Sequence, residues 1–565
     1  MEKNSTRQTC TSPKEETAPA KNYYEEPIFS HFHVGTVSEE AVPCDSGRLC
    51  CNGFYSYDGH GGRILSLVGS FLMAELYVNG SRRDMVGDTK LDIGDLLVIG
   101  KNEIKIVLHA SHAPAVLEDM IMLCEDHLIR VKHKQNLVWA EKQPESMLSH
   151  AERICRHLGK DTPLARLYKN AYLSTVCSVL DLCEDGTYFS VSGDIPGMWL
   201  RDSSTQMMHY LTVAKDPIVG EIFDGLLRRL LFYITVDPYA NSFNPSENGN
   251  GHIDDMPLQS KWVFERKYEI DSLCYPIRLL YLYWKQTGSE TVIRERLEEV
   301  ARIIVDQWRV EQHHMEKSPY RFIRPQPPVP WDTIPNNGLG SPVAYTGMTW
   351  CGFRPSDDGC TYGYLTASEM FAVVVLGYMA EMLEAVCQNT ALARECRALR
   401  DEIDEGIRKY CIIEHEKFGR IYACETDGMG NYTLIDDANV PSLLSIPYIG
   451  YATAEDEIYQ NTRRFLLSSE NPFYFEGKYA RGIGSRHTPD GYVWHIALVM
   501  QGLTSTSREE KRALLDMITA TDAGTGYLHE GFDVDHPENY TRDWFPWPNS
   551  LFAEFVEKCV EEGIL

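Results

Sequence analysis

The feature that most constrains this chain is a helical apolar period that recurs from about residue 145 to the end. Segments with apolar residues at positions i, i+3, i+4 and i+7 number about twelve. They include 223–235, 273–285, 291–312, 367–388, 391–412, 454–467, 494–504, 507–519 and 550–561. Each such segment must bury its apolar face against another element. The pattern therefore predicts a mainly helical domain over residues 146–565.

Long connections separate these helical segments. They are rich in Gly, Pro, Asn and aromatic residues, and they span 193–204, 237–261, 319–364, 471–492 and 524–549. Loops longer than about 12–15 residues are uncommon in compact domains unless they build a site. Helices paired in this number favour an (α/α)6 barrel, in which six hairpins close into a toroid and the loops meet at one end. A plain helical solenoid would have short loops and similar repeats, and no repeated sequence is visible.

A different pattern precedes the helical region. Residues 1–25 are rich in Lys, Glu, Thr and Pro, and we expect a flexible tail there. Residues 26–145 contain short apolar runs separated by Gly or Asn, such as RILSLVG and NEIKIVLHA. The fragments ELYVNG and LDIGDLLVIGKNEIKIVL resemble the end of a galactose-binding-like β-sandwich. We expect a small β-sandwich-like accessory module that either supports the helical domain or binds sugar itself.

Charge and composition exclude several classes of protein. Lys and Arg total 54 against 81 Asp and Glu, a net charge of −27. This charge argues against a nucleic-acid partner and against an anionic membrane surface, whereas a neutral sugar stays compatible. No stretch approaches the roughly 20 apolar residues that span a bilayer, so we expect no membrane partner. Hydrophobic residues make up 43% of the chain and aromatic residues 11%, enough for a large core.

The cysteines and the absence of nucleotide-binding motifs restrict the expected cellular location and the expected cofactors. The 16 cysteines are scattered and form no CxxC pair, and the N-terminus has no apolar signal-peptide core. We therefore expect a cytoplasmic protein with free thiols. No P-loop, GxGxxG fingerprint or GxSxG elbow is present. The group His252, Asp254 and Asp255 lacks a regular ligand spacing, so we expect neither a metal nor a cofactor.

The loop 193–206 carries the first candidate site residues. It places Trp199, Arg201 and Asp202 beside a predicted helix start. An Arg next to an Asp can bind a vicinal diol, with the guanidinium donating and the carboxylate accepting hydrogen bonds. Asp202 or Ser203 would equally well cap the helix, and the motif alone leaves both readings open.

Two further loops carry candidate catalytic carboxylates. The loop WCGFRPSDDGCTYGY contains the adjacent Asp357 and Asp358 between aromatic residues. Such a desolvated setting can raise the pKa of one carboxyl enough for a general acid, although adjacent Asp residues more often form a solvated turn. The loop GYLHEGF places Glu530 after His529, and several aromatic residues follow. Aromatic side chains around a few carboxylates are typical of a carbohydrate site.

Weaker candidates lie in two other segments. The segment 474–495 contains Glu476, His487 and His495, whose polar groups could contact sugar hydroxyls. The run KWVFERKYEID at 261–271 alternates charged and aromatic residues. It predicts either part of a pocket wall or an ion-paired helix start.

Taken in order, these motifs resemble glycoside hydrolase family 125, the exo-acting α-1,6-mannosidases. The matching stretches are MWLRDS (198–203), ERKYEIDSLCYP (265–276), GFRPSDD (352–358), YFEGKYARGIGSRHTP (474–489), GYLHEGF (526–532) and FPWPNSLFAEF (545–555). The resemblance covers residues 150–565 and leaves out the first 145. It implies an (α/α)6 barrel that removes terminal non-reducing α-1,6-linked mannose from an oligosaccharide, with inversion and without a metal.

The resemblance also implies roles for single residues. The first Asp of the Ser-Asp-Asp triplet, Asp357, would be the general acid, and Glu530 the general base. Arg201 and Asp202 would bind the mannose. The other predicted substrate-binding residues are Trp199, Arg354, Asp358, Glu476, His487, His495 and His529. The choice between Asp357 and Asp358 depends on one residue of register, and the charge of Asp358 could keep Asp357 protonated.

Two other functions stay open. A carbohydrate-binding protein that has lost catalysis would bind mannose without turnover, and the two candidate carboxylates argue against it. Another toroid enzyme, such as a glycoside phosphorylase, would need phosphate for turnover. The oligomeric state cannot be predicted from helical faces alone.

Overall fold

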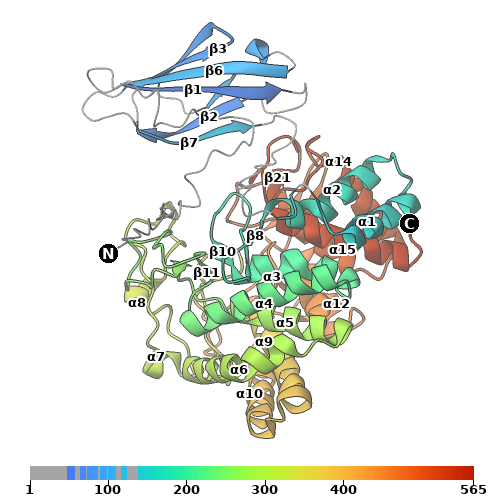
Figure 1. Ribbon diagram of the computed structural model, residues 1–565. Coiled ribbons are helices and arrows are strands. Elements are labelled where there is room, and N and C mark those ends of the chain that lie inside the picture. The colour runs from blue at the N-terminus through green and yellow to red at the C-terminus, as the bar shows by residue number, and fades with distance from the viewer. Residues whose placement is uncertain are drawn as a thin grey trace, which may run out of the picture.

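The computed structural model describes residues 48–57, 64–70, 73–86, 90–97, 100–109, 116–123, 138–140 and 142–565. The predicted tail over 1–25 lies outside these residues. Seven strands precede the helical region in the described part (Figure 1). They are β1 (Arg48–Tyr57), β2 (Ile64–Ser70), β3 (Met73–Val78), β4 (Ser81–Val86), β5 (Lys90–Asp92), β6 (Gly100–His109) and β7 (Val116–Leu123), with the 3-10 turn η1 (Gly94–Leu96) after β5.

These strands form two antiparallel sheets, one in the order β1-β6-β3-β4 and one in the order β5-β2-β7. The β3–β4 hairpin turns at Asn79 and Gly80, both with positive φ, as the favoured two-residue hairpin turn requires. Alternate residues of β3, namely Ala74, Leu76 and Val78, are fully buried. This period of two is the pattern of a sheet with one covered face. The boundaries expected for the accessory module remain a prediction.

The prediction of a mainly helical chain is confirmed. Each inner helix contacts the next inner helix along the chain, and the last contacts the first, so that they close a ring. They are α3 (Leu200–Met208), α5 (Ile270–Thr287), α9 (Thr366–Met382), α11 (Ile446–Ile449) with the preceding turn η4 (Leu443–Ser445), α13 (His495–Leu503) and α15 (Pro546–Glu561).

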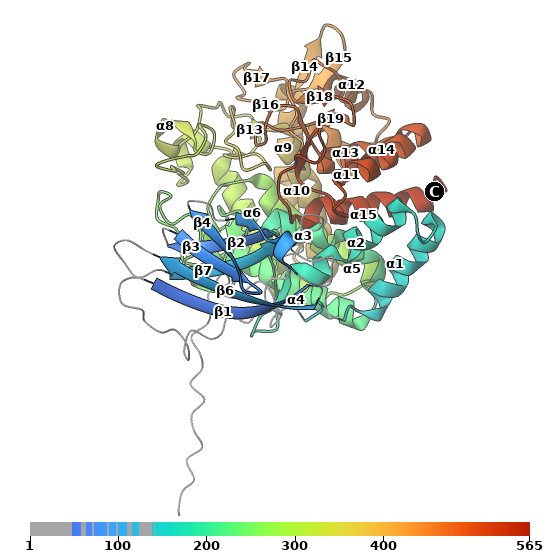
Figure 2. The same ribbon diagram turned by 90° about the horizontal axis from the view of Figure 1, so that it is seen from above.

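A second layer of helices packs on the outside of this ring. Figure 2 shows both layers in one region, where the outer helices α14 and α2 lie beside the inner helices α13 and α15. The outer helices are α2 (Pro163–Ser178), α4 (Pro217–Val236), α6 (Thr291–Glu311), α10 (Thr390–Tyr410), α12 (Glu457–Leu466) and α14 (Arg508–Ala520). The remaining helical segments are α1 (Glu145–Leu158), η2 (His209–Val213), α7 (His314–Lys317), α8 (Pro335–Gly338) and η3 (Leu383–Cys387).

The two layers differ in composition because they differ in burial. In the outer helix α10, the buried residues Leu392, Cys396, Leu399 and Ile403 recur every three or four positions, and charged residues cover the other face. The inner helix α9 lies between α5 and α10 and is apolar on most sides. The expectation that no stretch approaches the length and apolarity of a membrane span is wrong for one segment: among the described residues, 366–387 is the one helical stretch long and apolar enough to span a membrane. Its packing inside the helical domain accounts for that composition.

Short strands lie directly before several inner helices. β10 (Met198–Trp199) precedes α3, β13 (Tyr364–Leu365) precedes α9, and β20 (Tyr492–Trp494) precedes α13. The long loops therefore meet at the N-terminal ends of the inner helices. The other short strands are β8 (Leu180–Leu182), β9 (Tyr188–Ser190), β11 (Ser242–Phe243), β12 (Val263–Glu265), β14 (Ile412–His415), β15 (Gly419–Tyr422), β16 (Glu425–Thr426), β17 (Tyr432–Thr433), β18 (Tyr474–Glu476), β19 (Arg481–Ile483) and β21 (Gly531–Asp533).

Candidate active site

A cavity of about 210 Å³ lies where these loops meet. It brings together six residues that the sequence singled out: Trp199, Arg201, Asp202, Asp357, His487 and Glu530. Nine further residues complete its wall: Ser192, Ile195, Ser356, Asn439, Thr488, Trp494, Thr541, Arg542 and Phe545. The wall thus combines carboxylates, cations and aromatic rings, the mixture that suits a sugar.

Asp357 lies in a tight turn in front of α9. Its φ of 65° falls in the left-handed region, which residues other than Gly seldom adopt unless their surroundings hold them there. Residues distant in sequence fix this conformation of the turn. Asp437 accepts a hydrogen bond from Ser356 Oγ at 2.9 Å, and Asn439 Nδ2 donates to the carbonyl of Pro355 at 2.7 Å. The turn therefore presents the Asp357 carboxylate to the cavity.

Asp357 is held in its ionised form by its neighbours. Its Oδ1 lies 3.4 Å from Nη2 of Arg201 and accepts a hydrogen bond from Nδ2 of Asn241 at 3.3 Å. Burial by itself would raise the pKa of Asp357, but the charges of Arg201 and Lys267 outweigh it and hold that pKa well below its usual range. The sequence-based expectation that a neighbouring charge keeps Asp357 protonated is not met in the resting site.

Asp358 points to different partners. Its carboxylate lies 3.4 Å from Nε of Arg486 and 3.2 Å from Nδ1 of His487, and its side chain is 2% exposed. It does not line the cavity. Successive residues of the turn therefore face opposite surroundings, and the carboxylate at the cavity is that of Asp357.

Glu530 reaches the cavity from the end of the loop before β21. Its Oε2 accepts a hydrogen bond from Thr541 Oγ1 at 3.1 Å, and its Oε1 lies 3.7 Å from Nη1 of Arg542. Burial raises the pKa of Glu530, while the charges of Arg542 and His487 oppose the rise. A carboxylate that is partly desolvated in this way is a stronger base than one in water.

His487 is a cation between the two carboxylate loops. Burial lowers its pKa, but the hydrogen bond to Asp358 and the charges of Glu530 and Asp357 raise it, and the result is a pKa of about 9. His487 therefore carries a positive charge at neutral pH and faces both carboxylates across the cavity.

The pair of His487 and Asp358 should make the stability of the protein depend on pH. The pKa of His487 is raised from 6.5 to about 9, so its ion pair stabilises the fold fully below about pH 6.5 and is lost as the pH rises through 9. We expect the melting temperature of the wild type to exceed that of His487→Gln by more at about pH 6 than at about pH 10. Thermal unfolding curves of both proteins check this, and an equal difference at both pH values would contradict it.

A family model described as metal-independent alpha-mannosidase (GH125) matches residues 161–557. The chain belongs to this family. It is therefore a glycoside hydrolase, and its cavity is the candidate active site of an α-mannosidase.

Two relatives agree with the family match. The Meiotically up-regulated gene 157 protein of Schizosaccharomyces pombe is 35% identical over 425 residues, which cover 71% of this chain and 83% of that protein. A solved structure of a metal-independent α-mannosidase from Streptococcus pneumoniae, in a non-productive complex with α-1,6-mannobiose, is 44% identical. The match covers 74% of this chain and 99% of that one, with a TM-score of 0.72.

Two of the predicted sugar-binding residues lie away from the cavity of this α-mannosidase. Arg354 is buried, and its Nε donates to Glu425 Oε1 at 2.7 Å, so it anchors the Asp357 turn. Glu476 lies on β18, is exposed, and is 3.8 Å from Arg481. Arg354 thus has a structural partner in place of a sugar, and Glu476 faces solvent.

The two predicted histidines His495 and His529 also lie behind the cavity wall. His495 Nδ1 is 3.0 Å from the carbonyl oxygen of His529, and His529 Nδ1 is 3.1 Å from the carbonyl of Arg542. Burial lowers the pKa of His495 to about 3 and that of His529 to about 4. Both are therefore neutral rings that hold the Glu530 loop in place.

Other residues of the site were not predicted. Arg542 donates a hydrogen bond from Nη2 to Asp194 Oδ1 at 2.7 Å, and its guanidinium lies over the ring of Phe545. Both Arg542 and Phe545 lie in the aromatic segment that the sequence indicated. Asn439 lies in a segment with no such signal.

The run 261–271 proves to be an ion-paired helix start: Lys267 Nζ lies 2.7 Å from Asp332, and both are buried. Among the described residues, no group of three or more His, Cys, Asp or Glu is placed to hold a metal.

Proposed function

We propose that this α-mannosidase is an inverting exo-enzyme that releases terminal non-reducing mannose from α-1,6-linked manno-oligosaccharides. The observation that carries the proposal is that Asp357 and Glu530, from loops far apart in sequence, line one small cavity. Pockets for larger ligands have volumes of roughly 300–1,000 Å³. A cavity of about 210 Å³ suits a single sugar ring, as an exo-enzyme requires. The α-1,6-mannobiose in the Streptococcus pneumoniae structure supports the choice of linkage.

In the proposed reaction, Asp357 protonates the glycosidic oxygen as the bond from that oxygen to C1 breaks. Glu530 takes a proton from a water molecule, whose oxygen attacks C1 from the opposite face and gives β-mannose. The two carboxyl groups of inverting enzymes stand roughly 6.5–9.5 Å apart, which leaves room for that water. Arg201 and Asp202 can bind the hydroxyls, because both line the cavity and lie side by side, with Arg201 Nε 3.4 Å from Asp202 Oδ1.

Three further parts of the proposal concern the whole chain. The closed inner ring and the outer layer of helices support an (α/α)6 barrel. The eleven cysteines within residues 142–565, which include the buried Cys155, Cys274 and Cys559, are free thiols and support a reducing, cytoplasmic location. The antiparallel sheets before residue 124 would serve as an accessory module.

The test is NMR spectroscopy of the first sugar formed from synthetic α-1,6-mannobiose. We expect β-mannose to appear first and the α-anomer to grow in by mutarotation. Turnover should persist in phosphate-free buffer and in the presence of EDTA. Appearance of α-mannose first would contradict inversion, a need for phosphate would indicate a phosphorylase, and saturable mannose binding without any product would indicate a binding protein.

A further inference from the structure

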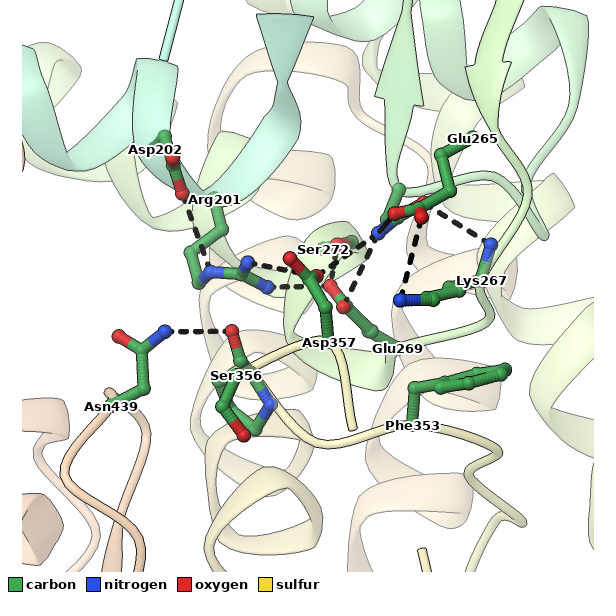
Figure 3. A network of polar contacts seen from close by, with 12 residues as sticks. Arg201, Asp202, Glu265, Lys267, Glu269, Ser272, Phe353, Ser356, Asp357 and Asn439 are labelled. Carbon is green, nitrogen blue, oxygen red and sulfur yellow. Dashed lines mark hydrogen bonds and ion pairs between the residues drawn. The ribbon is translucent and has the colours of Figure 1, made fainter. Parts of the chain in front are cut away.

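A buried cluster of acidic side chains surrounds the proposed acid. Glu265 on β12, Glu269 just before α5 and Asp271 in the first turn of α5 are each at most 3% exposed. Together with Asp202 and Asp357 they form a set of carboxyls around Arg201 and Lys267. Figure 3 shows Asp202, Glu265, Glu269 and Asp357 of this set. Arg324 also reaches Glu265, but it is shared with Asp255 and Asp332. The carboxyls of this cluster outnumber its cations.

The geometry brings Glu269 and Asp357 onto the same donors. Arg201 Nη1 donates to Glu269 Oε2 at 2.5 Å, while its Nη2 lies 3.4 Å from Asp357 Oδ1. Nδ2 of Asn241 lies 3.3 Å from Glu269 Oε1, 3.3 Å from Asp357 Oδ1 and 3.0 Å from Glu265 Oε2. An amide nitrogen has two hydrogens, so it cannot satisfy three carboxylate oxygens at once. Glu265, Glu269 and Asp271 are buried, while the Asp357 side chain is 24% exposed toward the cavity. Carboxylates that share so few donors at such low exposure favour a proton held among them over full ionisation.

We propose that Glu269 and Asp357 share one proton. The proton rests on Glu269 and passes to Asp357 before Asp357 protonates the glycosidic oxygen. This inference rests on the proposed function. In the resting site Glu269 would donate from Oε1 to the Asp357 carboxylate, because its Oε2 accepts hydrogen bonds from Arg201 Nη1 and Ser272 Oγ. During the reaction the proton passes to Asp357 and then to the leaving oxygen, which keeps the electron pair of the broken bond to C1. The water proton goes to Glu530, and solvent restores both groups.

The proton affinities of the two groups agree with this assignment. Burial raises the pKa of Glu269 well above its usual range; Arg201 opposes the rise, and the charges of Asp357 and Asp271 add to it. The pKa of Asp357 is lowered by Arg201 and Lys267. An acid that is ionised at rest has no proton to deliver. A protonated neighbour that hydrogen-bonds to it can supply that proton. Glu269 would thus act through Asp357, as a positioning and proton-storing residue.

The test compares two leaving groups in the Glu269→Gln variant. Mannobiose needs a proton on its leaving oxygen, whereas 2,4-dinitrophenyl α-mannoside leaves as a stable anion and needs none. We expect kcat on α-1,6-mannobiose to fall by about 10²–10³-fold, within the range of general acid catalysis. On the dinitrophenyl mannoside we expect a loss of less than about tenfold, because Gln can keep the hydrogen bond to Asp357.

The matched control is Glu369→Gln. Glu369 is also fully buried, burial raises its pKa, and it accepts a hydrogen bond from the backbone N–H of Thr349, but it lies in α9 away from the cavity. This variant should leave both rates within about twofold, since it changes no group that touches the site.

The outcomes separate the two proposals. Equal losses on both substrates would give Glu269 a merely structural role and overturn the shared proton. Failure of the wild type to release mannose from either substrate would overturn the proposed function, and this inference with it. If Glu269→Gln does not fold, infrared difference spectra of the wild type against Asp357→Asn supply the readout. We expect the band of a protonated carboxyl at neutral pH to shift, and an unchanged band would overturn the proposal.

Discussion

Replacing Glu530 by Gln is expected to lower kcat for mannose release from α-1,6-mannobiose by about 10²–10⁴-fold. An amide cannot take the proton from the attacking water, although it has nearly the same shape as the carboxylate. Its oxygen can still accept the hydrogen bond that Thr541 Oγ1 donates to Oε2 at 3.1 Å, so the fold should be retained. The measurement is kcat by mannose release, together with a thermal unfolding curve.

The matched control for this variant is Glu476→Gln. It makes the same chemical change on an exposed strand, where Glu476 lies 3.8 Å from Arg481. We expect wild-type kcat for it. If Glu530→Gln kept more than about a tenth of the wild-type rate, Glu530 would not be the base, because removal of a general base costs at least about 10²-fold.

Replacing Arg201 by Met is expected to destabilise the protein by about 3–5 kcal/mol, because it leaves buried carboxylates without their cation. The Arg201 side chain is 3% exposed and lies within 3.4 Å of carboxylate oxygens of Glu269, Asp271 and Asp357. Without Arg201 the pKa values of these carboxyls rise in the folded state. The destabilisation should therefore grow as the pH rises from about 5 to about 8, since the unfolded chain releases those protons more readily.

Denaturant unfolding of wild type and Arg201→Met at both pH values measures this effect. The control is Arg228→Met, which removes an Arg whose bond to Glu295 is exposed, with 36% and 43% of the two side chains accessible. Exposed pairs contribute about 0–1 kcal/mol, so the control should be close to wild type. A loss for Arg201→Met as small as that of the control would show that the carboxyl cluster does not depend on this cation.

The helical part of the fold could be predicted because its signal is local. The apolar period over 391–412 corresponds to α10, Thr390–Tyr410, whose cap residue Asn389 accepts a hydrogen bond from the N–H of Leu392. The aromatic loops could be identified for the same reason, since Gly, Pro and aromatic residues interrupt the period visibly. The family match over 161–557 bears out the resemblance that the loop motifs carried.

The direction of single side chains in those loops could not be predicted. His529 stands in a matched motif next to Glu530, and His495 follows another matched motif, yet both rings face backbone carbonyls behind the cavity wall. Asn439 reaches the cavity from a segment with no sequence signal, through a bond to the carbonyl of Pro355, 84 positions away. Loop side chains follow the local backbone angles, and contacts distant in sequence set those angles.

The sequence by itself determined that this chain is a mainly helical α-mannosidase and which loops carry its candidate reactive groups, because periodicity and motif order are local properties. Only the tertiary structure showed which of Asp357 and Asp358 lines the cavity, since a φ of 65° turns the first toward it and leaves the second with Arg486 and His487. It also decided that the resting Asp357 is ionised. That state depends on Arg201, 156 positions away in sequence, and electrostatic interactions act across space without regard to the order of the chain.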